Sequence, residues 1–193
     1  MEPKTLLAFL HRIEPLKTNT RHSVTAAGAP ESVAAHSWRL ATLALLLRGE
    51  LPGVDLDRVV RMCLVHDFGE AVTGDIPSFR KTGGNVRDEA RAVARLLAEL
   101  PAPQRDELSA LFAEMDAQET AEARVWNALD RMEAVIQHNE APLSSWLPLE
   151  RELQQTYGQR EAEAAGPYLA ALRAAVRRDT MDKLKEDTDG AAF

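Results

Sequence analysis

The most informative segment of the chain reads His66-Asp67-Phe68-Gly69-Glu70-Ala71-Val72-Thr73-Gly74-Asp75-Ile76-Pro77. It follows an apolar run over 59–65, so its polar residues come where a buried element should end. Three carboxylates and one imidazole within ten residues are costly to bury unless water, an opposite charge or a metal ion compensates them. We therefore interpret the segment as part of a metal site that carries out hydrolysis.

The composition is that of one soluble helical domain. The 193 residues are 45% hydrophobic and 27% charged, rich in Leu, Ala, Arg and Glu, and they lack long strand-like runs. The fold class that we expect is all-α, as a single compact helical bundle. The formal net charge of −7 disfavours a broad contact with nucleic acid, but it is compatible with a small phosphorylated substrate at a local metal ion.

Cysteine usage and hydropathy bear on the compartment. The single cysteine, Cys63, cannot form an internal disulfide, which is typical of a reducing cytoplasm. The apolar run over 40–47 is too short to span a bilayer, so we expect no membrane partner. These features predict a cytoplasmic protein.

Apolar periodicity and breaker residues place the helices. They are predicted over 3–14, 32–48, 55–74, 85–100, 104–115, 120–139, 149–157 and 161–178. We expect an irregular polar connection over 16–30. The predicted domain covers 1–178, with a core at about 30–140 and C-terminal helices at 149–178. The charged tail, 179–193, should be frayed or disordered.

Four candidate metal ligands come from three of these helices. They are His36, His66, Asp67 and Asp130. Two imidazoles and two carboxylates form a mixed nitrogen and oxygen set that suits one Mn, Co, Fe, Ni or Zn ion better than Mg or Ca. Four ligands on a six-coordinate ion leave positions for water and substrate, as in catalytic sites.

Other polar residues receive more ordinary interpretations. On the predicted helix 55–74, His66 and Glu70 lie four residues apart and should converge. Glu133 is expected to support a ligand or bond between helices rather than bind the metal. His138 is expected at the surface.

Three segments carry a family resemblance. They are Pro30-Glu31-Ser32-Val33-Ala34-Ala35-His36-Ser37, the segment 66–77 quoted above, and Leu129-Asp130-Arg131-Met132-Glu133-Ala134. This H…HD…D pattern resembles the HD-domain metal-dependent phosphohydrolases, and within them the branch of the bacterial 5′-deoxynucleotidases and the HD-domain-containing protein 2 family. The similarity spans roughly residues 5 to 160. It implies a helical homodimer that removes phosphate from deoxyribonucleoside 5′-monophosphates with a divalent transition metal.

The resemblance also assigns roles beyond the four metal ligands. Glu70 matches an acid/base position, and Asp75 matches a second catalytic carboxylate. Arg21 lies fifteen residues before His36, where this branch carries a phosphate-binding Arg. His22 follows it at a position where some bacterial members carry Trp against the sugar, so sugar selectivity stays open. Other candidate phosphate contacts are Arg12, Arg39, Arg80 and Lys81.

The expected function is hydrolysis of (deoxy)ribonucleoside 5′-monophosphates to nucleoside and phosphate, as a metal-dependent phosphomonoesterase. One alternative is an HD-type phosphodiesterase or nucleotide-polyphosphate hydrolase. Phosphodiesterase members usually add histidines for a second metal, and only His11, His22 and His138 remain here. Another alternative is a non-catalytic nucleotide-binding scaffold, which would need no proton-transfer groups such as Glu70 and Asp75.

Overall fold

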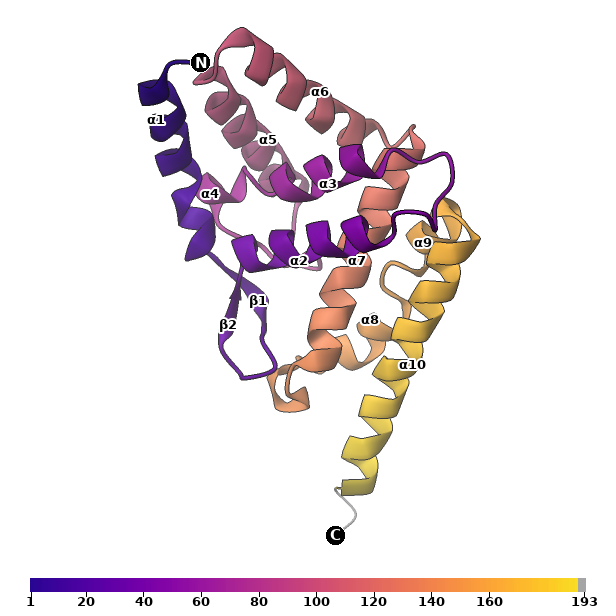
Figure 1. Ribbon diagram of the computed structural model, residues 1–193. Helices are drawn as coiled ribbons and strands as arrows, with labels where there is room; N and C mark the ends of the chain where they lie inside the picture. Colours follow the sequence, from indigo (N-terminus) through magenta and orange to yellow (C-terminus); the bar gives the residue numbers. More distant parts are fainter. Residues whose placement is uncertain (191–193) are drawn as a thin grey trace.

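Helices form most of the molecule, and the computed structural model describes residues 1–190 (Figure 1). The first half of the chain holds α1 (Pro3–Ile13), α2 (Val33–Leu46), α3 (Leu56–Val65), α4 (Glu70–Thr73) and α5 (Gly83–Ala98). The second half holds α6 (Ala102–Ala117), α7 (Ala121–Glu140), α8 (Glu150–Thr156), α9 (Gln159–Ala165) and α10 (Pro167–Gly190). Two short strands, β1 (Thr20–Val24) and β2 (Pro30–Ser32), are added, so the predicted all-α class is confirmed.

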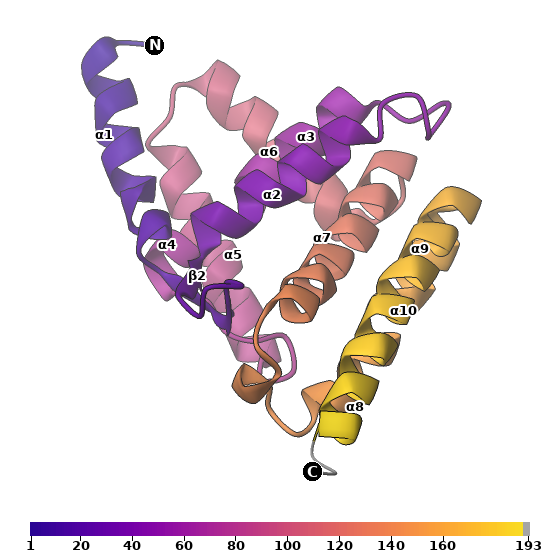
Figure 2. The same cartoon turned by 60° about the horizontal axis from the view of Figure 1, so that its bottom comes forward.

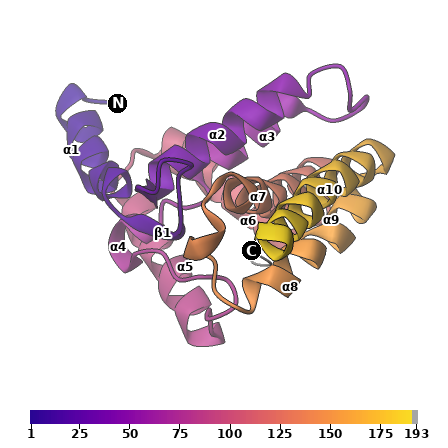
Figure 3. The ribbon, with the colours of Figure 1, turned by 90° about the horizontal axis from the view of Figure 1, so that it is seen from below.

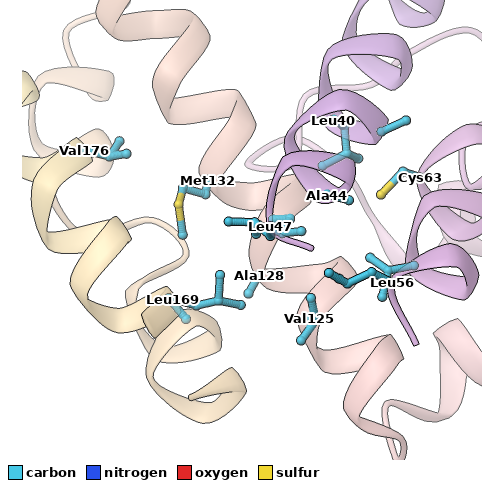
Figure 4. Close-up of a cluster of buried hydrophobic side chains, with 14 of the residues drawn as sticks. Leu40, Ala44, Leu47, Leu56, Cys63, Val125, Ala128, Met132, Leu169 and Val176 are labelled. Atoms are coloured by element: carbon cyan, nitrogen blue, oxygen red, sulfur yellow. The ribbon is translucent and has the colours of Figure 1, made fainter. Parts of the chain in front are cut away.

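The centre of the molecule is the mutual contact of α2, α3 and α7. Each helix contributes fully buried apolar side chains to one cluster, among them Leu40 from α2, Val59 from α3 and Leu129 from α7. Figure 4 shows this cluster, with Leu40 beside Cys63 and with Leu169 of α10 reaching it from the other side. Burial of apolar surface therefore fixes how these three helices cross.

Two groups of helices flank this centre. Helices α9 and α10 pack along α7, away from α2 and α3, as the view in Figure 2 shows. On the opposite side, Phe9 of α1 joins Val93, Leu96 and Leu97 of α5 in a second apolar cluster. Seen from below in Figure 3, α8 lies beneath α7 and next to α10.

Residues 16–30 are not the irregular connection that we expected. They include a hairpin in which β1 and β2 pair antiparallel, with Thr20 opposite Ser32. The turn closes when the Gly28 N–H donates to the Thr25 carbonyl at 2.8 Å, and Gly28 adopts φ +81°. The only sign of this hairpin in the sequence was a glycine-containing turn between two very short extended segments. That sign was too weak to outweigh the polar composition, which indicated an irregular connection.

The predicted helix 55–74 is interrupted at the most informative segment. Helix α3 ends at Val65, and α4 begins only at Glu70. Between them the Phe68 N–H donates to the Val65 carbonyl at 3.0 Å, three residues back rather than four. Gly69 permits this tight turn next to α5, because a Cβ there would lie 2.7 Å from Glu89 Cγ. Packing against α5 thus overrides helical periodicity.

The charged tail was also predicted wrongly. Helix α10 continues through the first part of 179–193 and ends at Gly190, whereas residues 191–193 lie outside the described part of the chain. The reason is a polar contact with α7, which composition does not reveal. Thr180 is fully buried, and its hydroxyl donates to Asn139 Oδ1 at 2.9 Å.

Replacement of Leu129 by Ala should lower the free energy of unfolding by about 2–5 kcal/mol, because it leaves a cavity where α2, α3 and α7 meet. Urea denaturation followed by circular dichroism measures the change. Leu7→Ala is the matched control: this leucine of α1 is 56% exposed, so its loss should change stability by less than about 0.5 kcal/mol. Equal effects of the two variants would contradict the assigned core.

Candidate metal centre and substrate cleft

Three structural elements bring the predicted metal ligands to one place. His36 lies in the first turn of α2, which begins where the Ser32 side chain accepts the Ala35 N–H at 3.1 Å. His66 and Asp67 occupy the tight turn after α3. Asp130 lies near the middle of α7, on the side that meets α2 and α3.

The four side chains are in contact with one another. Asp130 Oδ1 lies 3.0 Å from His36 Nε2 and 3.6 Å from His66 Nε2. Asp67 Oδ2 lies 3.1 Å from the same nitrogen of His66. The two imidazole rings stand 5.5 Å apart, centroid to centroid. Asp130 therefore contacts both imidazoles, and Asp67 contacts that of His66.

The outer nitrogen of each imidazole is held by an acceptor. His66 Nδ1 donates to the Cys63 carbonyl at 2.9 Å. His36 Nδ1 is hydrogen-bonded to Glu133 Oε2, a carboxylate that is 1% exposed. Since carbonyl and carboxylate oxygens only accept, both Nδ1 atoms carry a proton, so release of the second proton, from Nε2, leaves a lone pair that faces the shared centre. That is the tautomer that a metal ligand needs.

The charges of the cluster compensate one another. Burial raises the pKa of Asp130, but hydrogen bonds from His36 and His66 outweigh burial and hold this pKa well below its usual value. Burial lowers the pKa of His66, yet attraction to Asp67 and Asp130 raises it well above the usual value. The carboxylates are thus kept ionised by positive charge at the imidazoles, a position that a cation can take over.

The donor set fits a metal ion. Nε2 of His66 and Oδ2 of Asp67 are buried atoms that make no hydrogen bond within the described residues. Ligand atoms of His36, His66 and Asp67 lie within 4.8 Å of one another, close enough for one ion. Asp130 adds a second carboxylate at the same point. Two nitrogens and two oxygens are donors suited to a divalent transition metal.

Glu133 supports this centre from α7. One carboxylate oxygen meets His36 Nδ1, and the other accepts the Nε–H of Arg39 at 2.6 Å. Burial raises the pKa of Glu133, but the hydrogen bond from His36 outweighs it and leaves the pKa below its usual value. Glu133 therefore orients the imidazole, in agreement with the supporting position that the sequence suggested.

The two predicted catalytic carboxylates line a cleft that opens beside the centre. Glu70 is 3% exposed, and its Oε2 makes no hydrogen bond within the described residues. Burial, together with the charges of Asp67 and Asp75, raises the pKa of Glu70 to about 9. Burial also raises the pKa of Asp75, against the opposing charge of Arg21. Glu70 can therefore hold a proton near neutral pH, and burial shifts Asp75 in the same direction.

Arg21 and His22 reach the same cleft from β1. The Arg21 guanidinium lies 3.4 Å from Glu31 and 3.8 Å from Asp67, measured from Nε and Nη1 respectively. Burial lowers the pKa of Arg21, but these and other carboxylates raise it above its usual value, so the cation is permanent. His22 points to the other end of the cleft, with Nε2 3.2 Å from Glu150 Oε1.

The structure distinguishes between the other residues that were considered as phosphate contacts. Arg12 pairs with Glu99, and Arg39 is held by Glu133 and Glu140. Arg80 lies over the ring of Phe79, 5.7 Å from its centroid. Lys81 lines the cleft while it pairs with Glu89. Lys81 is therefore the second cation next to Arg21.

The sequence analysis did not identify some of the residues that border the cleft. His138, expected at the surface, is 12% exposed at its side chain and borders the cleft, so that expectation was wrong. Its spacing on α7 carried a usable signal, since residues 130, 134 and 138 fall on one helical face. Glu150 and Gln154 of α8 also border the cleft, and nothing in their local sequence marked them.

The fold is a helical bundle, and its site combines two imidazoles and two carboxylates beside a cleft. Together they define the class of all-α domains that carry a metal site. The HD domain model matches residues 13–171, so the chain belongs to the HD domain family. Within the described residues, no helix combines the length and the apolar character that a membrane crossing requires.

Relatives support this placement. The chain is 33% identical over 142 residues to the 5′-deoxynucleotidase HDDC2 of Homo sapiens, which covers 71% of this chain and 68% of that protein. The protein of the same name from Xenopus laevis is 29% identical over 188 residues, 95% of this chain and 92% of its own. A crystal structure described as a predicted metal-dependent phosphohydrolase, from Magnetospirillum magnetotacticum, superposes with a TM-score of 0.80 at 32% identity over 93% of each chain.

Replacement of Glu133 by Gln should weaken metal binding by about 10- to 100-fold, because the amide cannot hold His36 in its ligand tautomer as the carboxylate does. Titration of Mn²⁺ or Co²⁺ into metal-free protein, followed by calorimetry, measures the dissociation constant. Glu140→Gln is the matched control, since Glu140 shares the Arg39 contact but does not touch His36. Equal metal affinity of the two variants would show that Glu133 does not support the metal centre.

Proposed function

We propose that this protein hydrolyses (deoxy)ribonucleoside 5′-monophosphates to nucleoside and phosphate in a metal-dependent reaction. The observation that carries the proposal is the contact of His36 and His66 with Asp67 and Asp130, at a cleft that these two carboxylates line together with the half-buried Arg21. Relatives named 5′-deoxynucleotidase support the substrate class, and the phosphohydrolase from Magnetospirillum magnetotacticum supports the reaction type.

The same four residues would hold one divalent ion, of Mn, Co, Fe, Ni or Zn. When bound, such an ion polarises a phosphoryl oxygen and lowers the pKa of a water molecule. The hydrogen bonds from His36 to Glu133 and from His66 to Cys63 keep both imidazoles oriented for this task.

Glu70 and Asp75 carry out the proton transfers of the reaction. Burial and neighbouring carboxylates raise the pKa of Glu70 to about 9, and a positive charge nearby would lower it. Glu70 is therefore the group that takes a proton from the attacking water. Asp75, whose pKa burial raises, supplies a proton to the leaving 5′-oxygen.

Arg21 binds the phosphate. Its guanidinium can donate two parallel hydrogen bonds to phosphoryl oxygens, and burial beside Asp67 places it next to the metal ligands. Lys81, which also lines the cleft, supplies a second positive charge. His22, the next residue after Arg21, contacts the nucleoside part of the substrate.

The proposal also includes that the protein is a homodimer in the cytoplasm. The outer side of α2 exposes Trp38 and Leu46, at 67% and 74%, which is the kind of apolar surface that a second subunit covers. The one cysteine, Cys63, is free and buried, as suits a reducing compartment. The net charge of −7 agrees with a small substrate rather than nucleic acid.

A phosphate-release assay with Mn²⁺ or Co²⁺ tests the function over a panel of ribo- and deoxyribonucleoside 5′-monophosphates. Wild-type protein should release phosphate, and Asp67→Ala should lose metal binding and activity together, because a ligand is gone. Cleavage of bis(p-nitrophenyl) phosphate without monophosphate hydrolysis would favour a phosphodiesterase instead. Tight nucleotide binding without turnover would indicate a scaffold.

Glu70→Gln should keep the metal and lose activity. Glutamine fills the same space but cannot transfer a proton, so kcat should fall by on the order of a hundredfold or more. Metal titration of the same variant serves as the control and should give the wild-type dissociation constant. A variant with the wild-type kcat would show that another group performs this proton transfer.

A further inference from the structure

A buried arginine of α10 lies outside the catalytic cleft. Arg173 is 2% exposed, and its printed contacts are with the backbone of α8 and its end. Its Nε donates to the Tyr157 carbonyl and its Nη2 to the Gln154 carbonyl, each at 2.8 Å. Carbonyls at the end of a helix lack partners within that helix, so Arg173 caps α8. The cap fixes the guanidinium but opposes its charge only with the partial charge of a helix terminus.

The charge of Arg173 is otherwise uncompensated. Among the residues that the structure describes, no carboxylate forms an ion pair with Arg173, and its buried Nη1 makes no hydrogen bond. Burial lowers the pKa of Arg173, and the nearby charge of Arg177 lowers it further, whereas carboxylates raise the pKa of Arg21. A guanidinium nevertheless stays protonated in proteins. A buried cation with two free N–H groups on Nη1 therefore lacks an anion.

A hollow of about 430 Å³ lies next to this cation, between α8, α9 and α10. Ala170, Arg173, Ala174 and Arg177 border it at spacings of three and four residues, so they share one face of α10. The two alanines leave the space between the arginines open. Its volume is in the range of small-molecule sites, and none of its lining residues lines the catalytic cleft.

We propose that this hollow binds an oxyanion of the phosphate class, either inorganic phosphate or the phosphate group of an ester. Arg173 donates from Nη1, and Arg177 donates from an exposed guanidinium that forms no ion pair within the described part of the chain. Two guanidinium groups one helical turn apart suit an anion with several oxygens. The site does not depend on the proposed catalytic function, since it shares no residue with the catalytic cleft.

The other polar residues of the hollow set the strength of binding. Thr156 and Gln159 offer a hydroxyl and an amide, although Gln159 Nε2 already donates to Glu163 Oε1 at 2.9 Å. The Glu163 carboxylate also borders the hollow and repels an anion. Glu163 is exposed, so water screens its charge, whereas Arg173 is buried and acts at lower dielectric. The positive charge therefore dominates.

The test is a phosphate titration of Zn²⁺-loaded, ¹⁵N-labelled protein followed by NMR, with sodium chloride at matched ionic strength as the reference. Amide signals of residues 156–159 and 170–177 should shift and saturate, with a dissociation constant of about 1 mM or below. A deoxyribonucleoside 5′-monophosphate is titrated in parallel into Asp67→Ala, which should not hydrolyse it. The ligand that binds more tightly identifies the source of the phosphate group.

Variants separate this site from an arginine that only caps α8. Arg177→Gln should weaken binding by about 3- to 5-fold, as for an exposed charge, and Glu163→Gln should strengthen it. Arg178→Gln, the matched control, removes the same charge next to Arg177 but outside the hollow, and it should bind as the wild type does.

Ala174→Glu should abolish the saturable shifts without altering Arg173, because it places a carboxylate in the hollow from an exposed position. This variant leaves the buried cap of α8 in place, so it also covers the case in which Arg173→Gln fails to fold. Shifts that grow without saturation for both ligands would overturn the inference, as would unchanged binding in folded Ala174→Glu. Loss of phosphate release in the activity assay would contradict the proposed function and leave this result intact.

Discussion

The buried Asp67 and the half-buried Asp130 face the imidazoles of His36 and His66 where α2, α3 and α7 meet, and this set of charges constrains the rest of the molecule. Ionised groups away from water are tolerated only with close opposite charges or a metal ion. Apolar burial brings the three helices together, so the hydrophobic core supplies the free energy that holds the charges in place. The site is thus built from the core outward, with Glu133 and the Cys63 carbonyl fixing the outer face of each imidazole.

The tight turn between α3 and α4 has a second role in this arrangement. In a continuous helix, His66 and Asp67 would point about 100° apart. The three-residue hydrogen bonds of the turn instead bring both side chains to Asp130 and Arg21. Gly69 makes this possible because α5 passes too close for any side chain. A packing constraint from a distant helix therefore shapes the metal centre.

The four candidate ligands could be chosen from sequence because their residue types and spacing are chemically unusual, and the structure brings their side chains into contact. The helices could be predicted because apolar periodicity reports burial of one face. The hairpin carrying Arg21, the interruption at His66 and the helical continuation past Asp179 could not, since each depends on a distant contact. Such contacts are the closure at Gly28, the approach of α5 to Gly69 and the Thr180–Asn139 hydrogen bond. Glu150 was missed for the same reason: only the tertiary fold brings α8 to the cleft.

Helix α7 links the two ends of the cleft. It carries Asp130 at the candidate metal centre and, on the same face, His138 beside Glu150 of α8. Each of these residues is paired with a group from another element, His36 from α2 and Glu150 from α8. A rigid helix with both ends anchored cannot lengthen or shorten the distance between them. On the proposed function, α7 therefore fixes how far the nucleoside can lie from the phosphate, and the polar groups at its far end decide which nucleoside fits.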